Sequence, residues 1–410
     1  MASVLDIDAL LGDPQIAIIV CCGAGGVGKT TTAAALGLRA AESGRRVVVL
    51  TIDPARRLAQ SLGLTNLDNT PRSVQEVDTT DGGSLDAMML DMKRTFDEVV
   101  QAHTTAEKAE QILANPFYQA VSSSFAGTQE YMAMEKLGQL SLEAARDPDN
   151  PRWDLIVVDT PPSRSALDFL DAPRRLGSFL DGRFIRLLAA PAKVGGRAYL
   201  KVFTTGVNIV TTTMTKVLGG QMISDVQTFV AALDTMFCGF RKRADHTYAL
   251  LSDRATAFIV VAAPERDALR EASYFVDRLD EEKMPLAGLV VNRVYRVSAS
   301  GLSAARALSA AEQLGDLGAL ECSQDGGTLD SSGGSATASP SLPGAESTAI
   351  TQGLLRLHAV QAEIAARHQS LTRRFIAGHP DIPTVEVPAA SGDIHDLAGL
   401  RAVGQALAGH

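Results

Sequence analysis

A glycine-rich stretch that ends in lysine and threonine is the first feature of this sequence that could carry out chemistry. Residues Gly23–Thr30 fit the pattern G-x-x-x-x-G-K-[ST]. The glycines let successive backbone N–H groups point at one phosphate, and the lysine can reach β- and γ-phosphate oxygens. The residues expected to bind a nucleotide here are Gly23, Ala24, Gly25, Gly26, Val27, Gly28, Lys29, Thr30 and Thr31.

Two aspartates stand directly after apolar, strand-like runs. Asp159 follows Leu155–Val158, and Asp53 follows another such run. Because the carboxyl ends of parallel strands face the ligand crevice, both carboxylates are expected beside the phosphates. Thr30 and Asp159 offer the oxygen ligands that Mg²⁺ prefers. Asp53 either orients an attacking water or caps the helix that starts near Pro54.

Short runs rich in valine and isoleucine alternate with longer stretches of helical periodicity. The runs are Ile16–Cys22, Arg46–Ile52, Asp154–Asp159, Ala257–Ala263, Leu286–Asn292 and Pro383–Val387. Such runs predict central strands of a parallel sheet, and their alternation with helices predicts a doubly wound α/β fold. A further pair, Ser73–Val77 and Leu85–Leu90, is expected to add an edge hairpin.

Two stretches, Met92–Arg152 and Arg164–Arg254, are too long for simple crossovers and predict an inserted helical subdomain. Within the second, residues 182–224 contain six basic residues and no Asp or Glu, interleaved with apolar residues. Cationic groups on apolar stems suit a client protein's amphipathic helix or a peripheral membrane contact. Apolar residues at helical spacing more often face a subdomain core, and both interpretations hold if a groove opens in one nucleotide state.

The composition is that of a folded globular protein. Of the 410 residues, 46% are hydrophobic and 21% are charged, which excludes global disorder. The net charge of -9 argues against a nucleic-acid partner. Four cysteines are too few for a disulfide framework, and the absence of a Cys-x-x-Cys pair argues against a thiolate zinc site or a thioredoxin-type motif. With no basic leader and no apolar run of membrane-spanning length, a cytoplasmic protein is expected. Ser323–Thr348, rich in Ser, Gly and Pro, is expected to be a disordered loop.

Three motifs in one order carry a resemblance to a known family. The loop Gly23–Thr30, the segment Asp53–Leu58 and the segment Asp159–Ser163 resemble those of the arsenical-pump-driving ATPases (ArsA) and of the related ATPases that target tail-anchored membrane proteins. The resemblance covers most of the chain, except residues 182–224 and the Ser323–Thr348 tract. It implies a P-loop NTPase fold, with the second segment as switch I and the third as switch II.

The same resemblance implies ATP and Mg²⁺ as cofactors and gives roles to particular residues. Asp53 would activate the attacking water, and Asp159 would be the switch II residue on the Mg²⁺ side. Asn292 looks like the strand-end residue that reads adenine, and Pro388 and Ala389 look like the loop that closes over the base. Family members dimerise face to face around ATP, so a homodimer, or a heterodimer with a related ATPase, is implied.

The sequence also departs from the family pattern. The family's loop usually has a lysine that crosses the dimer to the partner's phosphates, and here that position is Ala24. Arg56, Arg57 and Arg164 could supply the missing charge; Arg56 and Ser165 replace the usual switch histidines. The metalloid-binding cysteines and the zinc-binding cysteine pair have no counterparts, so the chain looks most like bacterial relatives described only as anion-transporting ATPases.

Two functional hypotheses follow. The first is a Mg-dependent ATPase that couples hydrolysis to binding of a client; the second is an ATP-binding regulatory or scaffold subunit with weak hydrolysis that needs a paralogous partner chain. A partitioning ATPase and a dinucleotide-binding dehydrogenase fit the motifs less well.

The predicted organisation is 1–91 for the phosphate loop and switch I, 92–152 for a helical insertion, 153–170 for switch II, 171–254 for the candidate client-binding subdomain, 255–300 for further core, 301–350 for the low-complexity loop, and 351–410 for a C-terminal helix, the adenine loop and the end of the core.

Overall fold

The structure is a computed structural model of the chain. It describes residues 3–52, 57–116, 118–119, 122, 128–147, 149–161, 242–324 and 343–409. Several predicted features therefore lie outside the described residues: Asp53 and the rest of switch I to Arg56, switch II from Pro162 onward with Arg164 and Ser165, and the segment 182–224.

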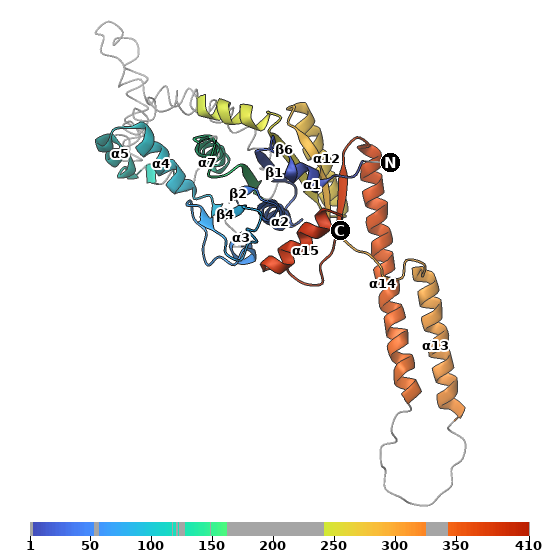
Figure 1. The fold of residues 1–410 in the computed structure, drawn as a ribbon. Coiled ribbons are helices and arrows are strands. Elements are labelled where there is room, and N and C mark those ends of the chain that lie inside the picture. Colours follow the sequence, from blue (N-terminus) through green and yellow to red (C-terminus); the bar gives the residue numbers. More distant parts are fainter. Residues whose placement is uncertain are drawn as a thin grey trace, which may run out of the picture.

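An eight-stranded sheet forms the centre of the molecule, in the order β3-β4-β2-β5-β1-β6-β7-β8 (Figure 1). The strands are β1 (Ile18–Cys22), β2 (Arg46–Thr51), β3 (Arg72–Ser73), β4 (Ser84–Met89), β5 (Leu155–Asp159), β6 (Thr256–Ala262), β7 (Leu286–Val294) and β8 (Thr384–Pro388). All pairings from β4 to β8 are parallel, and β3 pairs antiparallel with β4. The predicted α/β fold with a mostly parallel sheet is confirmed, although the edge strand β3 is shorter than expected.

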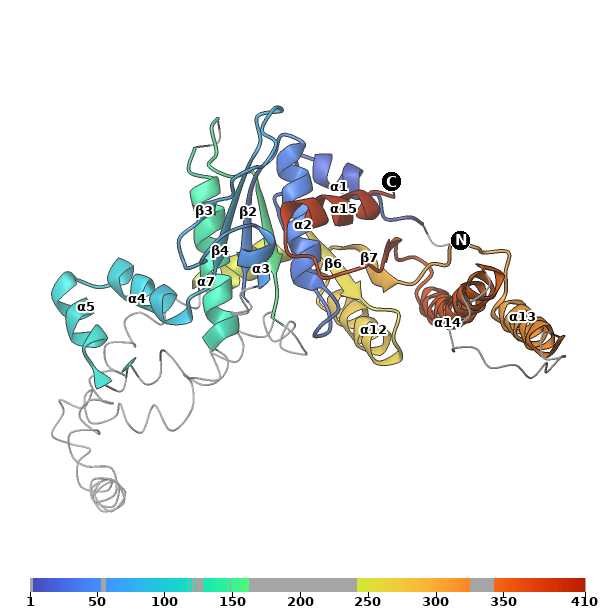
Figure 2. The same cartoon turned by 90° about the horizontal axis from the view of Figure 1, so that it is seen from below.

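Both faces of the sheet are buried, as the runs of apolar residues require. In β1, Ile18 and Val20 join the core on one face, whereas Ile19 and Cys21 join the core on the other. The first face is covered by α4 (Met92–His103), α5 (Ala106–Leu113), α7 (Thr128–Ala144) and α12 (Arg266–Glu281). The second face is covered by α1 (Ile7–Gly12), α2 (Lys29–Glu42), α3 (Arg57–Ser61) and α15 (Leu397–Leu407) (Figure 2).

The prediction of a loop over residues 301–350, which includes the tract Ser323–Thr348, is wrong at both ends. Helix α13 (Ala304–Gln324) occupies the first part, and helix α14 (Pro343–Gly378) begins before the tract ends. The two helices lie side by side and extend away from the sheet (Figures 1 and 2). Alanine is the strongest helix former, and Ala307 and Ala311 of α13 are fully buried, so propensity and packing both favour helix here.

Among the described residues, every helix is too short or too polar to cross a lipid bilayer. Helix α14 spans 36 residues, but charged side chains such as Arg356, Glu363 and Arg367 interrupt its apolar residues. The helix extends beyond the sheet (Figure 1) and is not an apolar membrane-spanning helix.

Candidate functional site

The loop Gly23–Thr30 joins β1 to α2 and has two positions where only glycine fits. Gly23 has a φ of +146°, and a Cβ there would lie 2.0 Å from the carbonyl oxygen of Val261. Gly28 has a φ of +96°, and a Cβ there would lie 2.2 Å from Nδ2 of Asn292. Both separations are steric overlaps, and both φ values belong to the region that glycine adopts without strain. The loop is therefore held closely against β6 and the end of β7.

Lys29 is the first residue of α2, and its side chain folds back over the loop. Its Nζ donates a 2.7 Å hydrogen bond to the carbonyl oxygen of Ala24, and the residue is only 6% exposed. Gly28 at the N-cap has no side chain to cap the first turn of α2, so backbone N–H groups and the positive end of the helix dipole face the loop. This arrangement suits a phosphate chain.

Asp159, at the end of β5, is the centre of a polar network. The residue is fully buried, and its Oδ2 accepts hydrogen bonds from the hydroxyls of Thr30 at 2.8 Å and Thr51 at 2.9 Å. Thr51 ends β2 directly beside Asp159 in the parallel register. The next residue, Thr160, donates its hydroxyl to the carbonyl oxygen of Cys21 at 2.8 Å. The structure thus brings the loop threonine and the strand-end aspartate into direct contact across 129 residues of sequence.

The chemistry of this pair fits a magnesium ion. Mg²⁺ keeps several water ligands and takes one or two protein oxygens together with substrate phosphate oxygens. Thr30 and Asp159 supply one hydroxyl and one carboxylate beside the phosphate loop. Among the described residues, no cluster of three or more His, Cys, Asp or Glu side chains offers a separate metal site.

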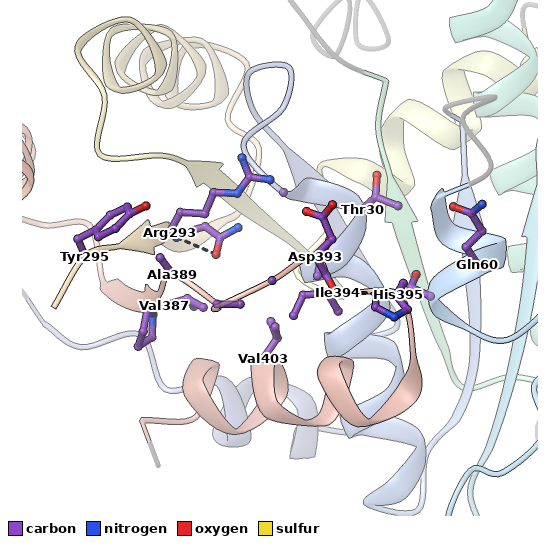
Figure 3. A pocket seen from close by; sticks show the side chains of 17 residues that line it. Thr30, Gln60, Arg293, Tyr295, Val387, Ala389, Asp393, Ile394, His395 and Val403 are labelled. Carbon is purple, nitrogen blue, oxygen red and sulfur yellow. Dashed lines mark hydrogen bonds between the residues drawn. The ribbon is translucent and has the colours of Figure 1, made fainter. Parts of the chain in front are cut away.

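A cavity of about 950 Å³ opens beside the start of α2 (Figure 3). Its wall combines the helix start, the end of β7, the loop after β8 and residues of α3 and α15. The lining residues are Gly28, Thr30, Thr31, Gln60, Ser61, Asn292, Arg293, Tyr295, Val387, Pro388, Ala389, Ala390, Gly392, Asp393, Ile394, His395 and Val403. The structure thus brings Asn292, Pro388 and Ala389, which the sequence analysis assigned to a base, to one cavity with Thr30 and Thr31.

Asn292 connects the wall of this cavity to the loop Gly23–Thr30. Its Nδ2 donates a 2.9 Å hydrogen bond to the carbonyl oxygen of Val27, and its Oδ1 accepts a 2.9 Å hydrogen bond from the backbone N–H of Arg293. An amide has a second N–H and a second lone pair, so the side chain can still pair with a base edge. Asn292 therefore positions the loop whatever else it binds.

Residues 16–306 match the family model ArsA_ATPase, described as "Anion-transporting ATPase". This chain belongs to the ArsA ATPase family. The match includes the loop Gly23–Thr30 and the segments Asp53–Leu58 and Asp159–Ser163, so the family predicted from these motifs is confirmed.

Individual relatives include ATPases from several organisms. The chain is 24% identical over 294 residues to ATPase ASNA1 homolog 2 of Paramecium tetraurelia, covering 70% of this chain and 78% of the relative. It is 29% identical over 167 residues to ATPase GET3 of Malassezia globosa, covering 40% and 44%. It is 31% identical over 183 residues to Protein Rv2184c of Mycobacterium tuberculosis, covering 41% and 40%. The last two matches span less than half of either chain.

Several residues of the cavity wall in this ArsA-family chain were not predicted from the sequence. Arg293 and Tyr295 lie at one end of the view in Figure 3, and Gln60 and His395 lie at the other. Arg293 has a φ of +61°, which is uncommon for a residue with a side chain, and it falls where the β7–β8 register shifts. A bulge of this kind re-aims side chains next to functional sites. Arg293 directly follows Asn292 and Tyr295 directly follows the end of β7, and that position near the strand end was the available signal.

The two cysteines near the phosphate loop are poor thiolate ligands. Burial raises the pKa of the Cys22 thiol to about 12, although the nearby Lys29 ammonium opposes the shift. Burial, with the carboxylate of Asp159, raises the pKa of Cys21 well above its usual value. Both thiols therefore stay protonated at neutral pH, and soft metalloids bind the deprotonated form. Within this ArsA-family site, Cys21 and Cys22 serve as apolar strand residues.

Replacing Asn292 with alanine should weaken ATP binding roughly tenfold, because two hydrogen bonds that fix the loop and the β7 bulge are lost. Calorimetric titration with ATP measures the change. Thr384→Ala is the matched control, since Thr384 Oγ1 makes only a local 3.2 Å contact with the Ile382 carbonyl oxygen at the start of β8. Equal affinities for the Asn292→Ala and wild-type proteins would contradict the role given to Asn292.

Proposed function

We propose that this chain is a Mg²⁺-dependent ATPase that works as a dimer and couples ATP hydrolysis to the binding of a client. The observation that carries the proposal is the direct contact between Thr30 and Asp159 beside the glycine loop. The adjoining cavity of about 950 Å³ is large enough for a nucleoside. Membership of the ArsA ATPase family supports the hydrolytic activity.

The proposed division of labour follows from charge and reach. Lys29 and the backbone N–H groups of the loop stabilise negative charge on the β- and γ-phosphates. Thr30 and Asp159 hold Mg²⁺, which when bound neutralises charge on the phosphate oxygens. Asp53 orients the attacking water, and Asn292 with the Pro388–Ala389 loop holds the adenine.

A contact between helix α7 and the residue that precedes switch I supports coupling to a client. Gln129, in the first turn of α7, donates its Nε2 to the carbonyl oxygen of Ile52 at 2.9 Å. Ile52 directly precedes Asp53, so a change in switch I after hydrolysis would act on α7 through one hydrogen bond. Residues 182–224, with their basic and apolar composition, are the proposed client-binding segment.

Ala24 favours a second candidate function. It stands where the family resemblance implies a lysine that acts across the dimer, and its carbonyl oxygen here accepts the bond from Lys29. Without that lysine, one chain has less positive charge with which to stabilise the transition state. The alternative is therefore an ATP-binding subunit with weak hydrolysis of its own, paired with a paralogous chain.

Steady-state hydrolysis of Mg-ATP by the purified chain, with Asp53→Asn as control, tests the proposal. We expect turnover in the wild-type chain and ATP binding without turnover in the variant. Tight ATP binding without turnover in both proteins would favour the regulatory subunit. Turnover that survives in the Asp53→Asn variant would remove Asp53 from the reaction.

A further inference from the structure

A row of residues along α14 has the spacing of a coiled-coil seam. Its members alternate in steps of four and three residues, which is the 3.5-residue period of helices that wrap around a partner helix. They are Ile350, Leu354, Leu357, Gln361, Ile364, His368, Leu371 and Phe375.

The C-terminal part of this row packs against the ATPase body. Phe375 is 6% exposed and belongs to the core on the first face of the sheet, and Leu371 packs against the same core. His368 contacts the ring of Tyr295 with centroids 5.5 Å apart, and its Nδ1 lies 3.3 Å from the Tyr295 N–H. From His368 to Phe375, the row therefore packs against the rest of the same molecule.

The N-terminal part of the row has the same character but is exposed. Ile350 is 64% exposed, Leu354 60% and Leu357 54%, and the adjacent Val360 is 55% exposed. Exposed aliphatic residues that gather on one helix face mark an interaction site more often than scattered ones. We call Ile350, Leu354, Leu357, Gln361 and Ile364 the outer seam.

Helix α13 does not cover the outer seam, because it packs on the opposite side of α14. Gln352 donates its Nε2 to the carbonyl oxygen of Ala311 at 2.9 Å, and Ala359 of α14 is 1% exposed. Residues 352 and 359 lie about 160–200° around the helix from Ile350, so the outer seam points away from α13.

We propose that the outer seam is a contact between two copies of this chain, formed by antiparallel pairing of α14 with α14 of the second copy. This contact goes beyond the proposed function and is separate from a dimer across the nucleotide face. The seam's period calls for a helical partner. A second copy supplies the same uncharged face, with no ionic group left unpaired in the contact.

The charges beside the seam favour a protein helix over a lipid surface. Arg356 and Glu363 are the charged residues between Thr348 and Ile364, and they cancel. An anionic membrane attracts segments with several cationic groups and little acid, which this stretch lacks. Gln361, the one polar member of the outer seam, can hydrogen-bond within a helical contact and limit the registers that are allowed.

The body of the molecule decides the direction of pairing. It occupies the seam beyond Ile364, so a parallel second helix in register would run into it. Antiparallel pairing uses only the outer seam and leaves the two bodies at opposite ends. In an antiparallel coiled coil, an a position of one helix faces a d position of the other. This register places Leu354 against the partner's Leu357 and Ile350 against the partner's Gln361.

Disulfide trapping in the full-length chain tests this geometry. All proteins carry Cys238→Ser and Cys322→Ser, so that the buried Cys21 and Cys22 are the native thiols left. A Leu354→Cys protein is mixed with a Leu357→Cys protein without nucleotide, oxidised mildly and digested for mass spectrometry. We expect the 354–357 disulfide at least several-fold above each homotypic product. The control mixture, Leu354→Cys with Arg356→Cys, should give only background, because position 356 lies off the seam.

A cross-link yield no higher than that control would overturn the proposal, and a predominant 354–354 product would overturn the antiparallel arrangement.

Sedimentation velocity on the nucleotide-free chain gives an independent test of self-association. Leu354→Asp should abolish concentration-dependent self-association, whereas Leu142→Asp, at a 61% exposed position on α7, should not. Both variants should still bind ATP. Loss of flotation with anionic vesicles in the Leu354→Asp protein, without any cross-link in the cysteine pair, would point to a membrane contact instead.

Discussion

Replacing Asp159 with asparagine is expected to lower the rate of ATP hydrolysis about 100-fold or more, with little change in stability. Asparagine has almost the same shape, and its Oδ1 can accept the hydrogen bonds that Oδ2 of Asp159 now accepts from Thr30 and Thr51. What disappears is the negative charge. A carboxylate attracts Mg²⁺ far more strongly than a neutral amide does, so the loss falls on the metal-dependent step.

The measurement is hydrolysis as a function of magnesium concentration, together with thermal unfolding of the same protein. We expect the Asp159→Asn protein to need more Mg²⁺ and to stay slow at saturation. Thr51→Val is the matched comparison, since it keeps the carboxylate but removes one of its hydrogen bonds. It should cost more stability than Asp159→Asn and less activity. If the two variants lose activity in proportion to stability, Asp159 has only a structural role.

The parts of the site that follow from strand ends could be predicted from the sequence. Asp159 ends the buried strand β5, and Gly28 and Thr30 lie at the start of α2, the helix that follows β1. Because the carboxyl ends of parallel strands lie at one edge of a sheet, these residues are expected close together. That rule also places Asn292, near the end of β7, at the same edge. The contact of Asn292 with the Val27 carbonyl oxygen could not be predicted, because it depends on a bulge at Arg293 with a backbone that residues with side chains seldom adopt.

The helical hairpin shows where composition misled the sequence analysis. The Ser- and Gly-rich tract predicts a loop, but helices extend into both of its ends. Ala307 and Ala311 are short enough to let α13 approach α14 closely, and the packing of one helix against the next is not visible in local composition. The 3.5-residue row on α14 was readable in principle, because its period differs from that of an ordinary surface helix.

Hydrogen bonds at the ends of the central strands bear on the proposed coupling between hydrolysis and client binding. The strand ends beside the loop Gly23–Thr30 are joined to one another by hydrogen bonds from the hydroxyls of Thr51 and Thr160, whereas Ile52 is joined to helix α7 by the side chain of Gln129. A nucleotide-dependent movement at the strand ends therefore has a short path into the helical part on the first face of the sheet. Such a path is a physical route for coupling, which the proposed client binding requires.

Replacing Lys29 with methionine is expected to weaken ATP binding roughly 10- to 100-fold, the cost of charge-assisted hydrogen bonds to phosphate. Methionine keeps the length and apolar stem of the buried side chain and removes the ammonium that now contacts Ala24. Because the lysine of such a loop contacts β- and γ-phosphate oxygens, which AMP lacks, we expect the affinity for ATP to fall more than the affinity for AMP. Titration of both nucleotides by calorimetry measures the difference.

Lys136→Met is the matched control for this substitution. Lys136 is also nearly buried, at 9% exposure, and its Nζ lies 3.2 Å from a carboxylate oxygen of Glu98, far along the chain from the phosphate loop. Removing it leaves Glu98 without that cation, so the protein should become less stable while its ATP affinity stays unchanged. A Lys29→Met protein that binds ATP as tightly as the wild type would refute the phosphate-loop assignment. Equal losses of ATP affinity in both variants would assign the effect of Lys29 to stability, because only Lys29 is placed to meet a phosphate.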